Sequence, residues 1–358
     1  MIIFILIITV VMLIGAKPAG INKYHDACSH EQTANVNAVF TLLIIISHAS
    51  MYLDLNDNPL DISYNIFRNY AGQFVVAPFL FFSGYGIMKS ISNKGYEYIK
   101  SFPKNRLFKV WYHFILALIP YIIMYLSGNI APNLSQILLS LIGIRSLGNS
   151  YWYMFDTFLM YIIIYLCFTL CFKIFKKSKQ TGVIFVFISV ISAYLIMHIF
   201  DMSSVFYTTI FCMPAGMIFS LIQKQLHKII TKNDFVFYTV FISLCVTLHF
   251  LQLTKFENAI VYNIFSIIGT LIVIMFCMKI KTNNKLLNFF SKHIFSIYIL
   301  QRIPMIVLDR LNINQYEYLF VILSIICTVP LACIFDKLTE KTDEIIYKKQ
   351  QKIKAVTH

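Results

Sequence analysis

The chain has 358 residues, of which 58% are apolar and only 13% are charged. Because an ordinary soluble domain is about one quarter charged, these values and a mean hydropathy of +0.72 exclude a water-soluble globular protein. The formal net charge of +14 fits either a nucleic-acid partner or a one-sided distribution of cations across a membrane.

Eleven apolar runs follow one another along the chain. Apolar runs of about 20 residues cross a bilayer as helices, because hydrocarbon contains no water to pair with backbone groups. The predicted fold class is therefore all-α integral membrane, a polytopic bundle of about 10–11 transmembrane helices. The runs lie at residues 2–16, 36–53, 72–91, 110–127, 151–172, 182–200, 205–222, 235–253, 259–278, 293–308 and 318–335.

The cationic residues alternate between the segments that separate these runs. Cytoplasmic loops of membrane proteins are enriched in Lys and Arg. Strict alternation therefore predicts a cytoplasmic C-terminus and explains the net charge without a nucleic-acid partner. The basic segments, which hold 25 of the 30 Lys and Arg residues, are 17–35, 89–109, 173–181, 223–234, 279–292 and 336–358. The outer segments hold Arg68, Arg145, Lys255 and Arg310.

The first apolar run, Ile2 to Gly15, spans only about 21 Å as a helix, against a hydrocarbon core of about 30 Å. Its nearby charge, Lys17, follows it, whereas a cleaved signal peptide carries positive residues before its apolar stretch. We expect an uncleaved helix with its N-terminus outside. The predicted division is 1–35, an N-terminal helix and cytoplasmic loop; 36–335, the main membrane domain; and 336–358, a basic cytoplasmic tail.

The eight cysteines form no C-x-x-C pair, and all but Cys28 lie in apolar runs, where cysteine behaves as a small hydrophobic residue. The segment from His25 to Glu31 carries side chains that can bind metals, but its spacing fits no closed zinc site. We expect neither a disulfide framework nor a metal site.

His48 is the clearest candidate for chemistry, because an ionisable side chain inside a span is costly and usually faces a cavity or a partner. It follows Asn37 by eleven residues on the same helix, which is about 16 Å along the axis. The structural alternative, a histidine bonded to a neighbouring helix, is equally compatible with the sequence.

Arg302 and Asp156 are two further charges within spans. Arg302 follows Gln301, and an arginine that snorkels to the outer headgroups is the simplest explanation. Asp156 either faces outer water or is the counter-charge of Arg145 or Arg302. The neighbouring aromatic residues 151–153 are typical of an interfacial belt.

Three cations gather near the inner face. Arg106 and Lys109 are three residues apart on a predicted helix and so share a face, with Lys104 close by. Such a group can hold a phosphate or pyrophosphate, although the positive-inside rule alone also accounts for it.

Several of these segments, taken together, resemble the acyltransferase 3 family of membrane-bound acyltransferases over about residues 35–336. In this family an Arg and a His lie on one helix with ten residues between them, and an aromatic run that ends in Ser-Gly follows. Here His48 matches, Asn37 takes the place of the arginine, and "FFSG" stands at 81–84.

Four later segments follow the family order. A cytoplasmic R-x-x-R pattern is similar to residues 106–109, with Lys109 in its last place. A Trp-aromatic opening of a span is similar to residues 151–153, and a P-x-G segment to residues 214–216. A closing S-x-x-Y-L-x-H pattern resembles "HIFSIYILQRIP" at 293–304, with Gln301 where histidine is common.

The resemblance implies a multi-pass enzyme of the bacterial plasma (inner) membrane. It would transfer an acyl group, most simply acetyl, from cytoplasmic acetyl-CoA or another acyl-CoA. The acceptor would be a hydroxyl of a surface polysaccharide, lipid-linked glycan or exported sugar, and membrane lipids would surround the bundle. His48 is expected to be the general base or the acyl carrier.

The remaining candidates receive roles on either side of His48. Asn37 and Tyr85 would orient the imidazole or the donor, and Trp152 would support the site. The outer, acceptor-facing half would be lined by Arg302 and Asp156. The CoA phosphates would be held by Arg106, Lys109 and Lys104.

A flippase or transporter of a glycan or anionic substrate is the main alternative, because it also has many spans and buried charges. Such a protein usually has broken helices or inverted repeats, and the sequence shows neither. A glycan polymerase or ligase would need a larger outer loop than residues 128–150. A scaffold without turnover would use its buried polar residues only to join helices.

Overall fold

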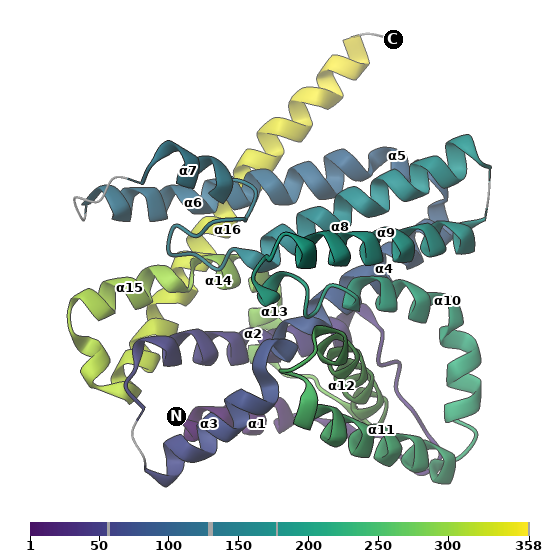
Figure 1. The fold of residues 1–358 in the computed structure, drawn as a ribbon, viewed down its shortest axis with the longest axis horizontal. Coiled ribbons are helices and arrows are strands. Elements are labelled where there is room, and N and C mark those ends of the chain that lie inside the picture. Colours follow the sequence, from purple (N-terminus) through teal and green to yellow (C-terminus); the bar gives the residue numbers. More distant parts are fainter. Residues whose placement is uncertain (56–57, 128–131, 177, 357–358) are drawn as a thin grey trace.

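The computed structural model describes residues 1–55, 58–127, 132–176 and 178–356, with side chains up to Ile346. This part of the chain is almost entirely helical, and the protein is an all-α polytopic membrane protein (Figure 1). The helices are α1 (Ile2–Leu13), α2 (His30–Ala49), α3 (Pro59–Ala71), α4 (Ala77–Lys94), α5 (Tyr96–Phe102), α6 (Lys109–Ser127), α7 (Leu134–Ser140), α8 (Trp152–Thr169), α9 (Lys179–Ile199), α10 (Cys212–Ile230), α11 (Asp234–Thr254), α12 (Ala259–Lys279), α13 (Lys285–Lys292), α14 (Ile294–Leu300), α15 (Arg302–Arg310) and α16 (Glu317–Val356).

Short elements connect these helices. The helical turns are η1 (Ser50–Tyr52), η2 (Gly72–Val76), η3 (Pro103–Phe108), η4 (Leu170–Ile174), η5 (Ser204–Phe206) and η6 (Ile313–Gln315). The strands are β1 (Lys17–Pro18) and β2 (Ile280–Lys281).

Helix starts are fixed by capping side chains. The Ser29 side chain accepts a hydrogen bond from the backbone N–H of Gln32 at the start of α2. Such a bond satisfies one of the free N–H groups of the first turn. The same role at α3, α7, α9, α11, α12 and α13 is played by Asn58, Asn133, Ser178, Asn233, Asn258 and Asn284.

Among the described residues, 8 helical segments are long and apolar enough to cross a membrane. They are His30–Tyr52, Pro59–Lys94, Tyr96–Ser127, Trp152–Ile174, Lys179–Ile199, Asp234–Thr254, Ala259–Lys279 and Glu317–Ile346. The N-terminal helix α1 has 12 residues and packs against α2 and α3.

Two predicted spans have a different form in the structure. The run at 293–308 is divided at Gln301 into α14 and α15. In the run at 205–222 the α-helix begins only at Cys212, after the short turn η5 and a loop that is bonded to other elements. In that loop Thr208 donates to Gln73, and the backbone N–H of Phe211 donates to the Asn263 side chain at 2.9 Å.

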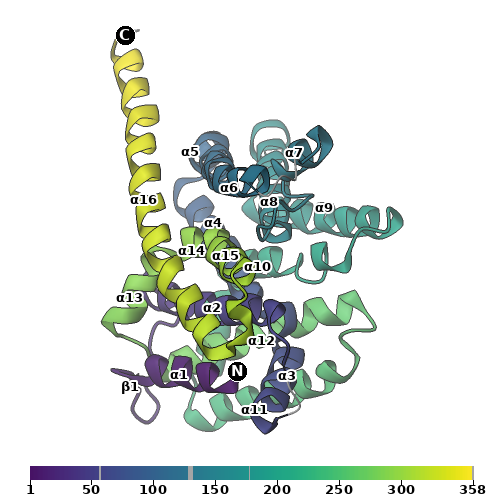
Figure 2. The same ribbon diagram turned by 90° about the vertical axis from the view of Figure 1, so that its left-hand side faces the viewer.

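The helices form three groups that both views show. Helices α5, α6, α8 and α9 lie together on one side of the molecule, and α1, α3, α11 and α12 lie on the opposite side (Figures 1 and 2). Between them lie α2, α4, α10 and α14. A buried apolar cluster joins the two sides through Phe40, Phe81, Phe114 and Phe158.

The predicted cytoplasmic segments meet one another in space. Strand β1 pairs antiparallel with β2, which places segments 17–35 and 279–292 side by side. Lys281 pairs with Glu31 at 2.9 Å, and Lys109 pairs with Asp343 of α16 at 2.6 Å. These contacts support the predicted alternation of sides. Lys177 of the basic segment 173–181 lies outside the described residues.

Two glycines allow α4 and α10 to cross closely. A Cβ added to Gly84 would lie 2.0 Å from the backbone oxygen of Met213, and one added to Gly216 would lie 1.9 Å from the backbone oxygen of Phe81. Small residues at such crossings let helix backbones approach within a membrane. The Ser-Gly and P-x-G segments of the sequence are therefore the two halves of one helix contact.

Candidate active site

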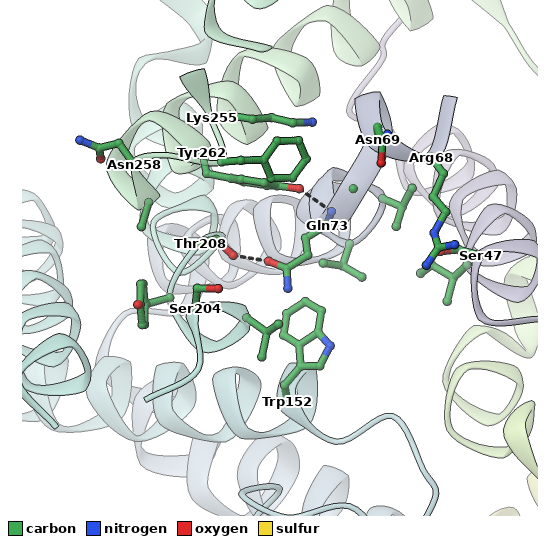
Figure 3. A pocket seen from close by; sticks show the side chains of 18 of the residues that line it. Ser47, Arg68, Asn69, Gln73, Trp152, Ser204, Thr208, Lys255, Asn258 and Tyr262 are labelled. Atoms are coloured by element: carbon green, nitrogen blue, oxygen red, sulfur yellow. Dashed lines mark hydrogen bonds between the residues drawn. The ribbon is translucent and has the colours of Figure 1, made fainter. Parts of the chain in front are cut away.

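A cavity of about 770 Å³ lies among the helix ends that the charge pattern predicts to be outer (Figure 3). Its walls include His48 in the last turn of α2 and Trp152 at the start of α8. The other walls, residues 68–73, 204–208 and 255–260, belong to or adjoin the predicted outer segments. The volume falls within the range of about 300–1,000 Å³ that is usual for ligand sites.

His48 is connected to a cation through a hydroxyl group. Its Nδ1 lies 3.4 Å from Ser150 Oγ, and Arg302 Nε lies 3.2 Å from the same oxygen. An arginine N–H can only donate, so the serine oxygen accepts from Arg302 and its own proton is free to be donated to His48. When the Ser150 proton is donated in this way, Nδ1 is the acceptor and the ring proton lies on Nε2; in the other tautomer, Nδ1–H donates to the Ser150 oxygen.

The break between α14 and α15 lies directly beside this group. The Tyr298 ring stands 6.4 Å from the His48 ring and 5.1 Å from the Tyr153 ring, measured between centroids. At the break, Gln301 Nε2 donates to the Tyr298 carbonyl oxygen at 3.0 Å, and the Tyr121 hydroxyl donates to the carbonyl oxygen of Ile299 at 2.7 Å. These side chains satisfy carbonyl groups at a helix end. They hold the break in place next to the imidazole.

A polar wall faces His48 across the cavity. The backbone N–H of Gln73 donates to the Tyr262 hydroxyl at 2.6 Å, and Thr208 donates to the Gln73 side chain (Figure 3). Gly72 adopts φ +48°, and a Cβ there would lie 2.2 Å from the Tyr262 hydroxyl oxygen. Only glycine therefore lets this tyrosine reach the backbone of η2.

Lys255 brings a buried cation to the wall. Its side chain is almost fully buried, and its Nζ donates to the Tyr70 carbonyl oxygen. The Nζ also lies 4.2 Å from the centre of the Phe265 ring and 5.3 Å from that of Tyr262, within the range of cation–π attraction. Burial lowers the pKa of Lys255 to about 8.

The rest of the wall is polar and carries both signs of charge. Arg68, Glu257 and His198 line it together with the amides of Asn69 and Asn258. Side chains of this kind can bind the hydroxyl and charged groups of a polar ligand. Within the described residues, no group of three His, Cys, Asp or Glu side chains is arranged to hold a metal ion.

Comparison with known families identifies the protein class. The chain matches the family model Acyl_transf_3, described as an acyltransferase domain, over residues 36–337. The chain belongs to the acyltransferase 3 family. Comparisons with curated proteins and with solved structures give no match. The protein is thus a membrane acyltransferase, and the predicted family resemblance is confirmed.

Three of the predicted site residues of this acyltransferase 3 protein come together at the cavity. His48 and Trp152 line it, and Arg302 reaches His48 through Ser150. The second guanidinium contact of Arg302 is the sulfur of the exposed Met51 at 3.3 Å. The guanidinium thus contacts both the Ser150 hydroxyl beside His48 and an exposed side chain, so a role beside His48 and snorkelling are both compatible with its position.

Asp156 lies one turn beyond Trp152 on α8 and is fully buried. Among the described residues, neither of its carboxylate oxygens has a hydrogen-bond partner, and no ion pair with Arg145 or Arg302 is present. Asp156 does not line the cavity. Asp156 therefore does not form the expected ion pair with Arg145 or Arg302, and its side chain is not exposed to outer water.

Asn37 and Tyr85 lie away from the imidazole. Asn37 is eleven residues before His48 on α2, about 16 Å along the axis. The Tyr85 hydroxyl donates to Gln223 Oε1 of α10 at 2.8 Å. Neither residue lines the cavity, so a direct role in orienting the ring has no support from the geometry.

The three predicted phosphate-binding cations lie on or beside η3, at the predicted cytoplasmic side. Lys104 and Arg106 are exposed, and Lys109 pairs with Asp343. None of the three lines the cavity around His48. Any donor site that they form is therefore separate from this cavity.

Sequence reasoning missed three residues of the site. Ser150 directly precedes the aromatic opening of α8 but is 102 residues from His48 in sequence. Tyr298 belongs to the closing motif, and no local pattern places it beside the imidazole. The sequence predicts Lys255 only as an outer cation, and the one signal for a larger role is that it is the single cation of segment 254–258.

Proposed function

We propose that this membrane acyltransferase transfers an acyl group, most simply acetyl, from cytoplasmic acetyl-CoA or another acyl-CoA to a hydroxyl of a glycan. The acceptor is a surface polysaccharide, a lipid-linked glycan or an exported sugar, and it binds in the cavity that His48 lines. The protein is expected to act in the bacterial plasma (inner) membrane. The observation that carries the proposal is the His48–Ser150–Arg302 group at the wall of this cavity.

His48 acts in this proposal as the general base for the acceptor hydroxyl or as the carrier of the acyl group. Either role produces charge at the reacting centre, as an imidazolium ion and as an oxyanion. Arg302 is the cation of the group. It supplies the positive charge that an arginine at position 37 would carry in the family pattern and that Asn37 does not carry. Ser150 fixes the ring by its bond to Nδ1.

The acceptor is assigned to the glycan class by the chemistry of the wall. Trp152 and Tyr298 offer aromatic faces, and Asn69, Gln73 and Asn258 offer amides that both donate and accept hydrogen bonds. Sugar rings combine apolar faces with many hydroxyl groups, and this wall complements both.

Cations on the predicted cytoplasmic side support acyl-CoA as the donor, because CoA carries phosphate groups that bind cations. Arg106 and Lys104 are exposed there and share one short segment. Arginine binds phosphate oxygens through two parallel hydrogen bonds, and lysine adds a point charge.

Mass spectrometry of surface glycans tests the proposal. Cells that produce the protein are compared with cells that lack its gene. We expect the loss of one acyl group per modified sugar in the second sample, which would identify both the acyl chain and the acceptor. Identical spectra, together with transport of a glycan into proteoliposomes without acyl-CoA, would instead support the flippase alternative.

A further inference from the structure

A second reactive arrangement lies at the predicted cytoplasmic end of α14, opposite the end that adjoins the break beside His48. His293 immediately precedes α14, and its Nδ1 bonds to Asp336 of α16. The other oxygen of Asp336 accepts from the Ser296 hydroxyl. The second ring nitrogen of His293, Nε2, lies 3.8 Å from the Cys333 sulfur.

The imidazole of His293 thus lies between the Cys333 thiol and the Asp336 carboxylate and contacts both. The carboxylate accepts the Nδ1 proton, so Nε2 presents its lone pair to the thiol. A thiol next to such a base is activated as a nucleophile, because the base can take its proton. An ion pair that only joined α14 and α16 would not need a thiol at the second nitrogen.

The position of the thiol suits a donor from the cytoplasm. Asp336 is nineteen residues beyond Glu317, about 29 Å along α16, which is about the thickness of the hydrocarbon core. Cys333 is partly exposed, as are His293 and Asp336. The seven residues of α14 separate His293 from the break beside His48, a rise of about 10 Å.

We propose that Cys333, His293 and Asp336 form a nucleophilic thiol site that accepts the acyl group from cytoplasmic acyl-CoA. The thiol proton moves to His293 Nε2, and the Cys333 sulfur attacks the thioester carbonyl carbon. A new carbon–sulfur bond forms as the bond to the CoA sulfur breaks. The departing CoA thiolate takes the proton from His293, so one thioester replaces another and free CoA leaves.

The identity of the acyl donor rests on the proposed function, whereas the reactivity of the thiol does not. The first measurement is therefore the rate at which iodoacetamide alkylates Cys333 in the purified protein at pH 7, followed by peptide mass spectrometry. We expect His293→Gln to lower this rate at least tenfold and to leave alkylation of Cys327 on the same helix unchanged. An unchanged rate at Cys333 would overturn the proposal.

The second measurement adds acetyl-CoA and looks for one acetyl group on the Cys333 peptide that neutral hydroxylamine removes. We expect this adduct in the wild type and in His48→Gln, which blocks only the later transfer. We expect none in His293→Gln. Cys333→Ser should lower acyl transfer at least tenfold, and Cys327→Ser should leave it intact. Full transfer by Cys333→Ser would overturn the thiol site and leave the proposed function standing, because that function rests on His48.

Discussion

Ser150 connects the imidazole of His48 to the guanidinium of Arg302. Replacing Ser150 should lower the catalytic rate and leave the binding of the acceptor almost unchanged. Its hydroxyl contacts both partners, at 3.4 Å and 3.2 Å. Ser150 does not line the cavity in the described structure. Substitution should therefore change the reactivity of His48 more than the affinity for the acceptor.

Ser150→Ala is expected to lower kcat about tenfold, the equivalent of one hydrogen bond of about 1.4 kcal/mol. The KM for the acceptor should stay within about twofold. Ser150→Thr keeps the hydroxyl and should retain most of the activity. Steady-state kinetics with purified enzyme distinguish these outcomes, and a raised KM with an unchanged kcat would contradict the assignment.

Lys255 gives a prediction about pH. Burial lowers its folded-state pKa to about 8, whereas an unfolded lysine titrates near about 10.4. Between these values the unfolded chain binds more protons than the folded chain, so the free energy of unfolding rises with pH. The melting temperature in detergent should therefore rise from pH 7.5 to 9.5 in the wild type relative to Lys255→Met. Equal pH dependence in both proteins would refute the lowered pKa.

At the scale of helices, the crossing of α4 and α10 depends on the absence of side chains at two positions. Gly84 and Gly216 each face a backbone oxygen at a distance that excludes a Cβ. Gly86 lies on the same helix, and a Cβ there would meet nothing within 4 Å. The chain therefore offers a matched pair of substitutions on α4.

Gly84→Ala should destabilise the protein by about 1–3 kcal/mol, because the helices must move apart. Gly86→Ala should be neutral or slightly stabilising, since alanine favours a helix by about 1 kcal/mol over glycine. Thermal unfolding in detergent measures both effects. Equal melting temperatures for the two variants would show that the close crossing is not needed.

The elements were predicted where hydropathy alone determines them. Apolar runs located α2, α4, α8, α9, α11, α12 and α16, because a bilayer requires a continuous apolar helix. The break lies at Gln301 and Arg302, the polar pair in the middle of the run at 293–308, but that pair alone does not show that the helix ends there. Its position depends on Tyr121 from another helix, which a local pattern does not reveal.

At the scale of the whole molecule, charge alternation predicts that the basic segments share one side of the membrane and that the cavity opens toward the other. The pairing of β1 with β2 and of Lys109 with Asp343 joins basic segments, as this prediction requires. The cavity was not predictable, since loops at 204–208 and 255–260 build it and carry no periodic signal. His48 was found from sequence, whereas its partner Ser150 comes from a distant segment.

Sidedness is tested by labelling with a membrane-impermeant maleimide. The single variants Lys281→Cys and Glu257→Cys are made in protein whose native cysteines are replaced by Ser or Ala. In sealed cells, Glu257→Cys should react and Lys281→Cys should react only after the membrane is opened. Reaction of Lys281→Cys in sealed cells would place the basic segments outside.

The central claim is that His48, at the wall of the outer cavity, carries out the acyl transfer. The most direct measurement is surface-glycan acylation, followed by mass spectrometry, in cells that lack the native gene and produce His48→Gln. His249→Gln is the matched control, because His249 lies on the exposed face of α11 and does not line the cavity. We predict that His48→Gln abolishes acylation and that His249→Gln preserves it. Full acylation by His48→Gln, at equal protein levels, would contradict the account.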